Sequence, residues 1–139
     1  MAVPLIRKRF TVHDFHRMAE AGIFGEDDRY ELIDGEIVEM AAIGSKHSSC
    51  ITTCTQICYE LLGRSVTIIV QGPIQIGPDY EPQPDLIIAR PRTDNYREDN
   101  PTPEDILLLI EVADSSFTYD QTVKVPIYAA AGIQEFWLV

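Results

Sequence analysis

Two carboxylates in the second half of the chain lie beside the most apolar segments of the sequence. Asp85 directly precedes the run 86–89, and Glu111 ends the run 106–111. Both runs are rich in Leu and β-branched residues and are bounded by Pro, Asp or Ser, which predicts buried strands. Carboxylates at the margin of an apolar sheet cost several kcal/mol each unless a cation or a proton neutralises them. The pair therefore predicts a site for a hard divalent cation, because such ions prefer carboxylate and carbonyl oxygens.

A helix is predicted after the second of these strands, and it carries a lysine. Asp120, Lys124 and Tyr128 recur at four-residue intervals, so they share one face of this helix. One interpretation is an ion pair on a solvated surface, which stabilises a helix by a few tenths of a kcal/mol. The helix follows the Glu111 strand directly, which favours the other interpretation, that this face points back toward the acids.

The segment 30–40 predicts a β-hairpin, because Asp-Gly at 34–35 between two β-rich runs calls for a two-residue type I′ turn. The turn fixes the register and places Glu31 opposite Val38, on the face that also carries Ile33. A carboxylate on an apolar face has two interpretations. It is a third acid of the site, or it is an edge-strand charge that discourages aggregation.

Two further polar residues are candidates for the same site. His47 falls in the first turn of a helix predicted from about Lys46 to Leu62, with Ser45 as N-cap and Gly63 as stop. There it could be a neutral hydrogen-bond partner or face a phosphate, or it could serve in capping and packing. Gln71 lies at a predicted bend between two strands, at 65–70 and 73–76. It points into the cleft of Asp85 or is an ordinary polar residue at a kink.

The predicted helix also carries three cysteines, Cys50, Cys54 and Cys58, spaced four apart. This spacing matches no common zinc or iron-sulfur pattern. We therefore expect a core-facing stripe of small apolar residues beside Leu61 and Leu62.

Taken together, these residues resemble the PD-(D/E)-x-K nuclease signature. Pro84-Asp85, Glu111 and Lys124 occur in its order, but Ala113 stands where the pattern wants its lysine. Such a displaced lysine is typical of the Uma-two family, or domain of unknown function 820, which is classed as restriction endonuclease-like. The resemblance extends from about Thr11 to the last residue, through the segments 30–36, Gly44 with His47, Val112 with Ser115 and Ser116, and 132–137.

The resemblance implies a single α/β domain over residues 1–139, with a restriction endonuclease-like central mixed sheet flanked by three helices. Family members usually continue past the tryptophan that corresponds to Trp137, so we expect a C-terminal extension to be lacking. Asp85, Glu111 and Glu31, with the carbonyl of Val112, would hold Mg²⁺ or Mn²⁺. Lys124 would position the attacking water or stabilise developing charge. The supporting residues would be His47, Gln71, Asp120 and Tyr128.

The function implied by the resemblance is metal-dependent hydrolysis of phosphodiester bonds in nucleic acid, with DNA as the expected substrate and a homodimer as an option. The alternative is a non-catalytic interaction or regulatory module on the same fold, which Ala113 and the acidic composition favour. The formal charge of -11 argues against a generic nucleic-acid-binding surface, because affinity for the phosphate backbone comes from Lys and Arg. Basic residues gather instead at 7–17 and in a long exposed loop predicted between Ala89 and Ile106, so weak or partner-assisted binding is expected.

The amino terminus and the hydropathy of the chain indicate where in the cell the protein is expected. The amino terminus has its charges after a short apolar patch and no long hydrophobic core, so no signal peptide is predicted. No window approaches the length of apolar sequence that crosses a bilayer. A cytoplasmic protein without a membrane partner is therefore expected.

Overall fold

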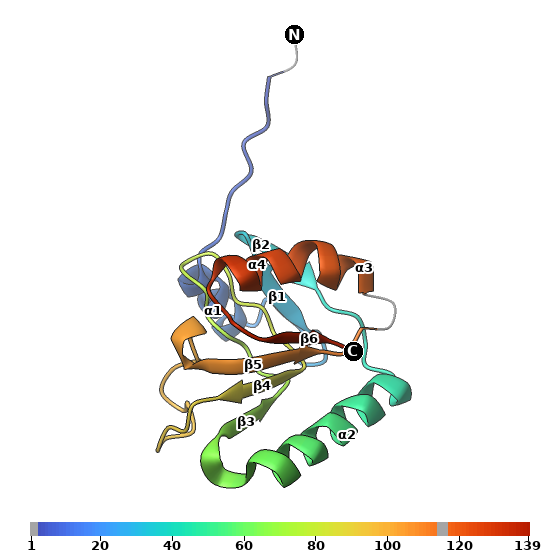
Figure 1. Ribbon diagram of the computed structural model, residues 1–139. Coiled ribbons are helices and arrows are strands. Elements are labelled where there is room, and N and C mark those ends of the chain that lie inside the picture. The colour runs from blue at the N-terminus through green and yellow to red at the C-terminus, as the bar shows by residue number, and fades with distance from the viewer. Residues whose placement is uncertain (1–2, 114–116) are drawn as a thin grey trace.

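The centre of the computed structural model, which describes residues 3–113 and 117–139, is a four-stranded sheet (Figure 1). Ser115 and Ser116, which belong to the resemblance described above, lie outside the described residues. Three neighbouring strands pair antiparallel and the last pairs parallel, so the predicted mixed sheet is confirmed. In spatial order the strands are β3 (Thr67–Val70), β4 (Leu86–Ala89), β5 (Ile106–Glu111) and β6 (Phe136–Leu138).

Helices cover both faces of this sheet. The long helix α2 (Ser45–Leu62) lies on one face, and a helical segment that ends in α4 (Val125–Ala130) lies on the other (Figure 1). The strands bury side chains on both faces, which explains why their sequences are continuous apolar runs. On β4, Leu86 and Ile88 pack toward Cys58 of α2, whereas Ile87 packs toward Tyr128 of α4.

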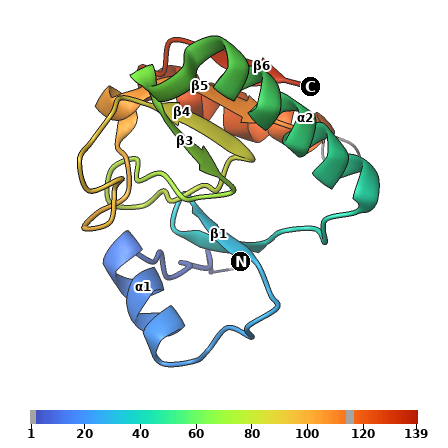
Figure 2. The ribbon, with the colours of Figure 1, turned by 90° about the horizontal axis from the view of Figure 1, so that it is seen from below.

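A separate hairpin precedes these layers. It consists of β1 (Tyr30–Ile33) and β2 (Glu36–Glu39), paired with Glu31 opposite Val38, so the predicted register is confirmed. Asp34 and Gly35 have φ angles of 51° and 74°, the left-handed values that a type I′ turn requires. The helix α1 (Val12–Glu20) packs against this hairpin and stands apart from the central sheet (Figure 2).

The Pro-rich segment before β4 joins the hairpin to the sheet. Leu32 and Glu81 exchange backbone hydrogen bonds of 3.2 and 2.8 Å. The N–H of Gln83 donates to Glu31 Oε2 at 3.0 Å, and its side-chain amide donates to the carbonyl of Tyr30. These contacts fix β1 beside the start of β4. They bring Glu31 to the end of the sheet at which Asp85 lies.

The helix α2 begins one residue earlier than predicted. Gly44 is its N-cap, without a side-chain hydrogen bond, and Ser45 is the first helical residue, whereas Gly63 ends the helix as predicted with a φ of 56°. Cys58 and Cys54 pack on the sheet, so part of the expected stripe is present. Leu61 and Leu62 are instead 78% and 39% exposed, so the stripe does not continue to the end of the helix.

The last helical segment is not a regular α-helix. It passes from α3 (Phe117–Tyr119) through a π-helical turn, η3 (Asp120–Lys124), into α4. The N–H of Val125 donates to the carbonyl of Asp120, five residues earlier. A proline follows at position 126, which has no N–H and would crowd the carbonyl four residues before it in a regular helix. The wider turn relieves this conflict, and such turns are frequent at functional sites.

Two connections differ from expectation. The segment 73–76 forms no strand, although the predicted bend before it is present at Gln71, whose φ is 53°. The loop 90–105 is anchored by Tyr96, which is buried and donates to the carbonyl of Arg90 at 2.6 Å, and it ends in a 3-10 turn, Pro103–Asp105.

Within the described residues, no helix has both the length and the apolar character needed to cross a membrane.

Candidate functional site

The two carboxylates that border the apolar runs lie side by side at one end of the sheet. Strand β4 pairs with β5 so that Leu86 is opposite Ile110, and one step further along the ladder Asp85 is opposite Glu111. Both residues are 4% exposed. The antiparallel pairing of two buried strands is therefore what brings together acids that are far apart in the sequence.

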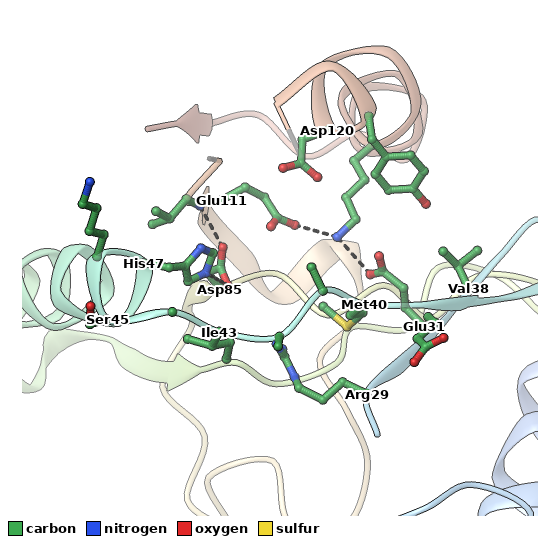
Figure 3. A pocket seen from close by; sticks show the side chains of 18 residues that line it. Arg29, Glu31, Val38, Met40, Ile43, Ser45, His47, Asp85, Glu111 and Asp120 are labelled. Carbon is green, nitrogen blue, oxygen red and sulfur yellow. Dashed lines mark hydrogen bonds and ion pairs between the residues drawn. The ribbon is translucent and has the colours of Figure 1, made fainter. Parts of the chain in front are cut away.

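Lys124 lies between two carboxylates. Its Nζ is 3.1 Å from Glu111 Oε1 and 2.9 Å from Glu31 Oε2, and the dashed lines in Figure 3 mark these two ion pairs. Tyr128, one turn further along the helix, donates its hydroxyl hydrogen to Glu111 Oε1 at 3.0 Å. All four side chains are buried. The sheet, the hairpin and the last helix thus each supply one wall of this cluster.

Burial controls the protonation of the cluster. It raises the pKa of Glu111 to about 8, because Asp85 and Asp120 add repulsion while the nearby Lys124 only partly offsets the loss of water. For Lys124, burial acts to lower the pKa, but the attraction of Glu111 and Glu31 outweighs it, so the pKa is raised. Lys124 therefore remains an ammonium group, and Glu111 gives up its proton at a higher pH than an exposed glutamate does.

Asp85 is held by two donors from different elements. Its Oδ1 lies 2.9 Å from His47 Nε2, and its Oδ2 accepts the N–H of Val112 at 2.8 Å. His47 is in the first turn of α2, and Figure 3 shows its ring directed toward Asp85. Val112 directly follows β5, so its N–H is available at the end of the sheet. These two hydrogen bonds fix the orientation of the Asp85 carboxylate.

These residues line one cavity of about 610 Å³. Asp120 also lines it and is 3% exposed, and it lies on the opposite side of Glu111 from Asp85 (Figure 3). Tyr128 supports the cavity from behind through Glu111. Gln71 does not line it in the described part of the chain; its N–H instead donates to the carbonyl of Asp85 at 2.9 Å. Gln71 is thus brought to the backbone of Asp85 rather than to the cavity.

The donor chemistry of this cavity decides which metal it could hold. In the ranges 3–113 and 117–139, no group of three or more His, Cys, Asp or Glu is arranged to hold a metal ion. Mg²⁺ needs no such cage, because it is commonly held by one or two carboxylates, with water and substrate phosphates completing its shell. Asp85 and Glu111 provide two neighbouring carboxylates at an open cavity, so the residues present fit Mg²⁺ or Mn²⁺. Glu31 is occupied by Lys124 and the N–H of Gln83.

Three residues with hydrogen-bond donors also line the cavity and were not predicted as site residues from the sequence. Arg29 precedes β1, Lys46 is in the first turn of α2, and Tyr119 ends α3. The strand pattern offered an indication only for Arg29, because residues two apart on a strand share a face and Arg29 is two residues before Glu31. Lys46 and Tyr119 had no comparable pattern.

Comparison with known proteins places this architecture among nuclease-like proteins. Residues 12–139 match the model of a protein family, Uma2, described as "Putative restriction endonuclease". A "putative nuclease belonging to DUF820" from Anabaena variabilis ATCC 29413 has a similar crystal structure, with a TM-score of 0.74 and 20% sequence identity over 94% of this chain and 73% of that chain. At this identity the likeness shows the fold alone. No curated protein matches the chain.

Proposed function

The chain belongs to the Uma2 family, and from this premise we propose that it is a metal-dependent nuclease that hydrolyses phosphodiester bonds. The observation that carries the proposal is the composition of the cavity. Among the described residues that line it, the buried charged side chains are four carboxylates and one lysine. Excess negative charge in a buried site requires protons or a bound cation. The four carboxylates are Glu31, Asp85, Glu111 and Asp120.

We assign the metal to Asp85 and Glu111. A bound Mg²⁺ or Mn²⁺ lowers the pKa of coordinated water and stabilises charge on a phosphoryl oxygen. The carbonyl of Val112 is a candidate for a further ligand, because this residue lines the same cavity. The hydrogen bond from His47 keeps one oxygen of Asp85 in a fixed direction, which reduces the reorganisation that ligand binding requires.

Lys124 is the residue that we assign to the chemical step. Its ammonium group lies among carboxylates in a buried site, where the field of a charge is much stronger than in water. There it orients the attacking water or stabilises the negative charge that develops on the phosphate. Loss of one such group typically slows a reaction about a hundredfold or more. Tyr128 keeps Glu111 in place, and Glu31 holds the ammonium group from the other side.

A non-catalytic interaction module on the same fold is the second candidate. The observation that favours it is the exposure of apolar side chains near the end of α2, where Ile57, Tyr59 and Leu61 are 49%, 56% and 78% exposed. The net charge of -11 also disfavours tight binding to nucleic acid. This candidate does not explain why carboxylates and a lysine are buried at an open cavity, so the nuclease is the better supported function.

One experiment separates the two candidates. The protein is incubated with single-stranded DNA, double-stranded DNA and RNA, each with Mn²⁺, with Mg²⁺ and with a chelator. The nuclease predicts new fragments that depend on the metal and disappear in Glu111→Gln. Fragments that persist in that variant indicate a contaminating nuclease, and their absence from all reactions of the wild-type protein supports the non-catalytic module.

A further inference from the structure

Two polar atoms are buried without a hydrogen-bond partner in the described part of the chain, and both belong to residues that line the same cavity. They are one terminal nitrogen of Arg29 and the hydroxyl oxygen of Tyr119. An unsatisfied buried donor destabilises the folded state, so native proteins rarely retain one without a reason. Both donors are therefore available to an acceptor group that enters this cavity.

The charge of Arg29 supports this interpretation. Carboxylates outnumber cations in this protein by 22 to 11, and Glu31 and Glu39 line the same cavity as Arg29. Even so, Arg29 forms no ion pair among the described residues, whereas Lys124 forms two. An arginine that remains without an anionic partner in such surroundings is available for an anion from outside.

The fold places these two donors on different walls of the cavity. Arg29 extends the hairpin ladder by one step, since its carbonyl accepts the N–H of Met40 at 2.8 Å, and it shares a strand face with Glu31. Tyr119 comes from α3 and directly precedes Asp120. A ligand that contacts both donors therefore bridges the hairpin and α3 within this cavity.

We propose that Arg29 and Tyr119 bind the phosphate backbone of a nucleic acid strand next to the scissile phosphate. The inference rests on the proposed nuclease function and adds the residues that hold the substrate. Phosphodiester oxygens only accept hydrogen bonds, which matches a guanidinium group and a phenol that both lack an acceptor. Both residues are half-buried, so a small rearrangement of their side chains brings the donor atoms to a strand in the cavity. A cavity of about 610 Å³ has room for a short stretch of a single strand.

The test compares Arg29→Gln with Arg64→Gln. Arg64 is exposed and lies just beyond the far end of α2, about 27 Å along the helix from the cavity, so its substitution removes the same charge elsewhere. Binding is measured by the fluorescence anisotropy of a labelled single-stranded phosphorothioate oligonucleotide with Mn²⁺. This backbone keeps its charge and resists hydrolysis. Thermal unfolding checks that each variant is folded.

We expect Arg29→Gln to weaken binding about tenfold and to reduce the slope of log affinity against log salt by about one. Tyr119→Phe weakens binding a few-fold, and Arg64→Gln weakens it less than Arg29→Gln does. In cleavage assays with an ordinary oligonucleotide, Arg29→Gln raises KM more than it lowers kcat, because it removes binding rather than chemistry.

Equal binding by the wild-type protein, Arg29→Gln and Tyr119→Phe overturns the inference and leaves the proposed nuclease function intact. If the wild-type protein binds the oligonucleotide but cleaves no substrate, the nuclease function fails, and the comparison of variants still decides whether Arg29 holds the strand. Absence of binding by the wild-type protein overturns both.

Discussion

Lys124 Nζ and Glu111 Oε1 lie 3.1 Å apart, although the lysine comes from a π-helical turn and the acid from the end of a central strand. Two residues after this acid, where the resemblance in the sequence predicts the lysine, the chain has Ala113. The helix thus delivers a positive charge to the same carboxylate from another direction. Both side chains are buried. The pair therefore affects the free energy of unfolding and its dependence on pH, and both effects can be measured.

Replacement of Lys124 should destabilise the metal-free protein. Lys124→Met leaves two buried carboxylates, Glu31 and Glu111, without their common cation, and removal of one partner from a buried pair typically costs about 3 to 5 kcal/mol. We expect the free energy of unfolding, measured with urea at about pH 8, to fall by about 3 kcal/mol. Lys46→Met is the control, since Lys46 lines the same cavity but is exposed. An equal loss in the two variants would contradict the assignment of Lys124 to the buried pair.

The pKa of Glu111 predicts how stability depends on pH. Burial raises this pKa from 4.5 to about 8 in the folded protein. Between these values the folded state binds more protons than the unfolded state, so the free energy of unfolding falls as pH rises through the window. Glu111→Gln cannot ionise and should show a flatter profile between about pH 5 and about pH 9 in a chelating buffer. Parallel profiles for the variant and the wild-type protein would show that Glu111 titrates normally.

The same carboxyl group couples metal binding to proton release. A cation that binds Glu111 at neutral pH displaces its proton, because ligands bind in their deprotonated form. Calorimetric titration with Mn²⁺ in buffers of different ionisation enthalpy should therefore report about one proton released per cation at about pH 7, and fewer at about pH 9. Glu111→Ala should lose this site. Binding that is unchanged in this variant rules out Glu111 as a ligand.

Much of the architecture could be predicted because local rules determined it. The Asp-Gly turn at 34–35 fixed the register of the hairpin, and that register placed Glu31 on a buried face. The two apolar runs are central strands, since they have helices on both faces. Their antiparallel pairing then brought Asp85 beside Glu111. The family model matched over residues 12–139 agrees with the resemblance seen in these segments.

Other features depend on contacts that no local pattern contains. The π-helical turn at 120–124 arises from a conflict between Pro126 and the helix, and a four-residue spacing does not reveal it. Tyr96 is buried although its loop is polar, because its hydroxyl meets a carbonyl of the same loop. The cavity position of Tyr119 depends on how α3 is placed, which follows from tertiary packing. The catalytic and metal-binding roles of the site residues remain predictions.

The most direct test of the account is the rate at which the wild-type protein, Lys124→Gln and Lys46→Gln cleave a nucleic acid with saturating Mn²⁺, under conditions in which all three are folded. We expect metal-dependent cleavage by the wild-type protein. The cleavage rate of Lys124→Gln should be lower by about a hundredfold or more, and that of Lys46→Gln should fall much less. Cleavage by Lys124→Gln at the wild-type rate would contradict the assignment of the chemical step to the lysine of the π-helical turn.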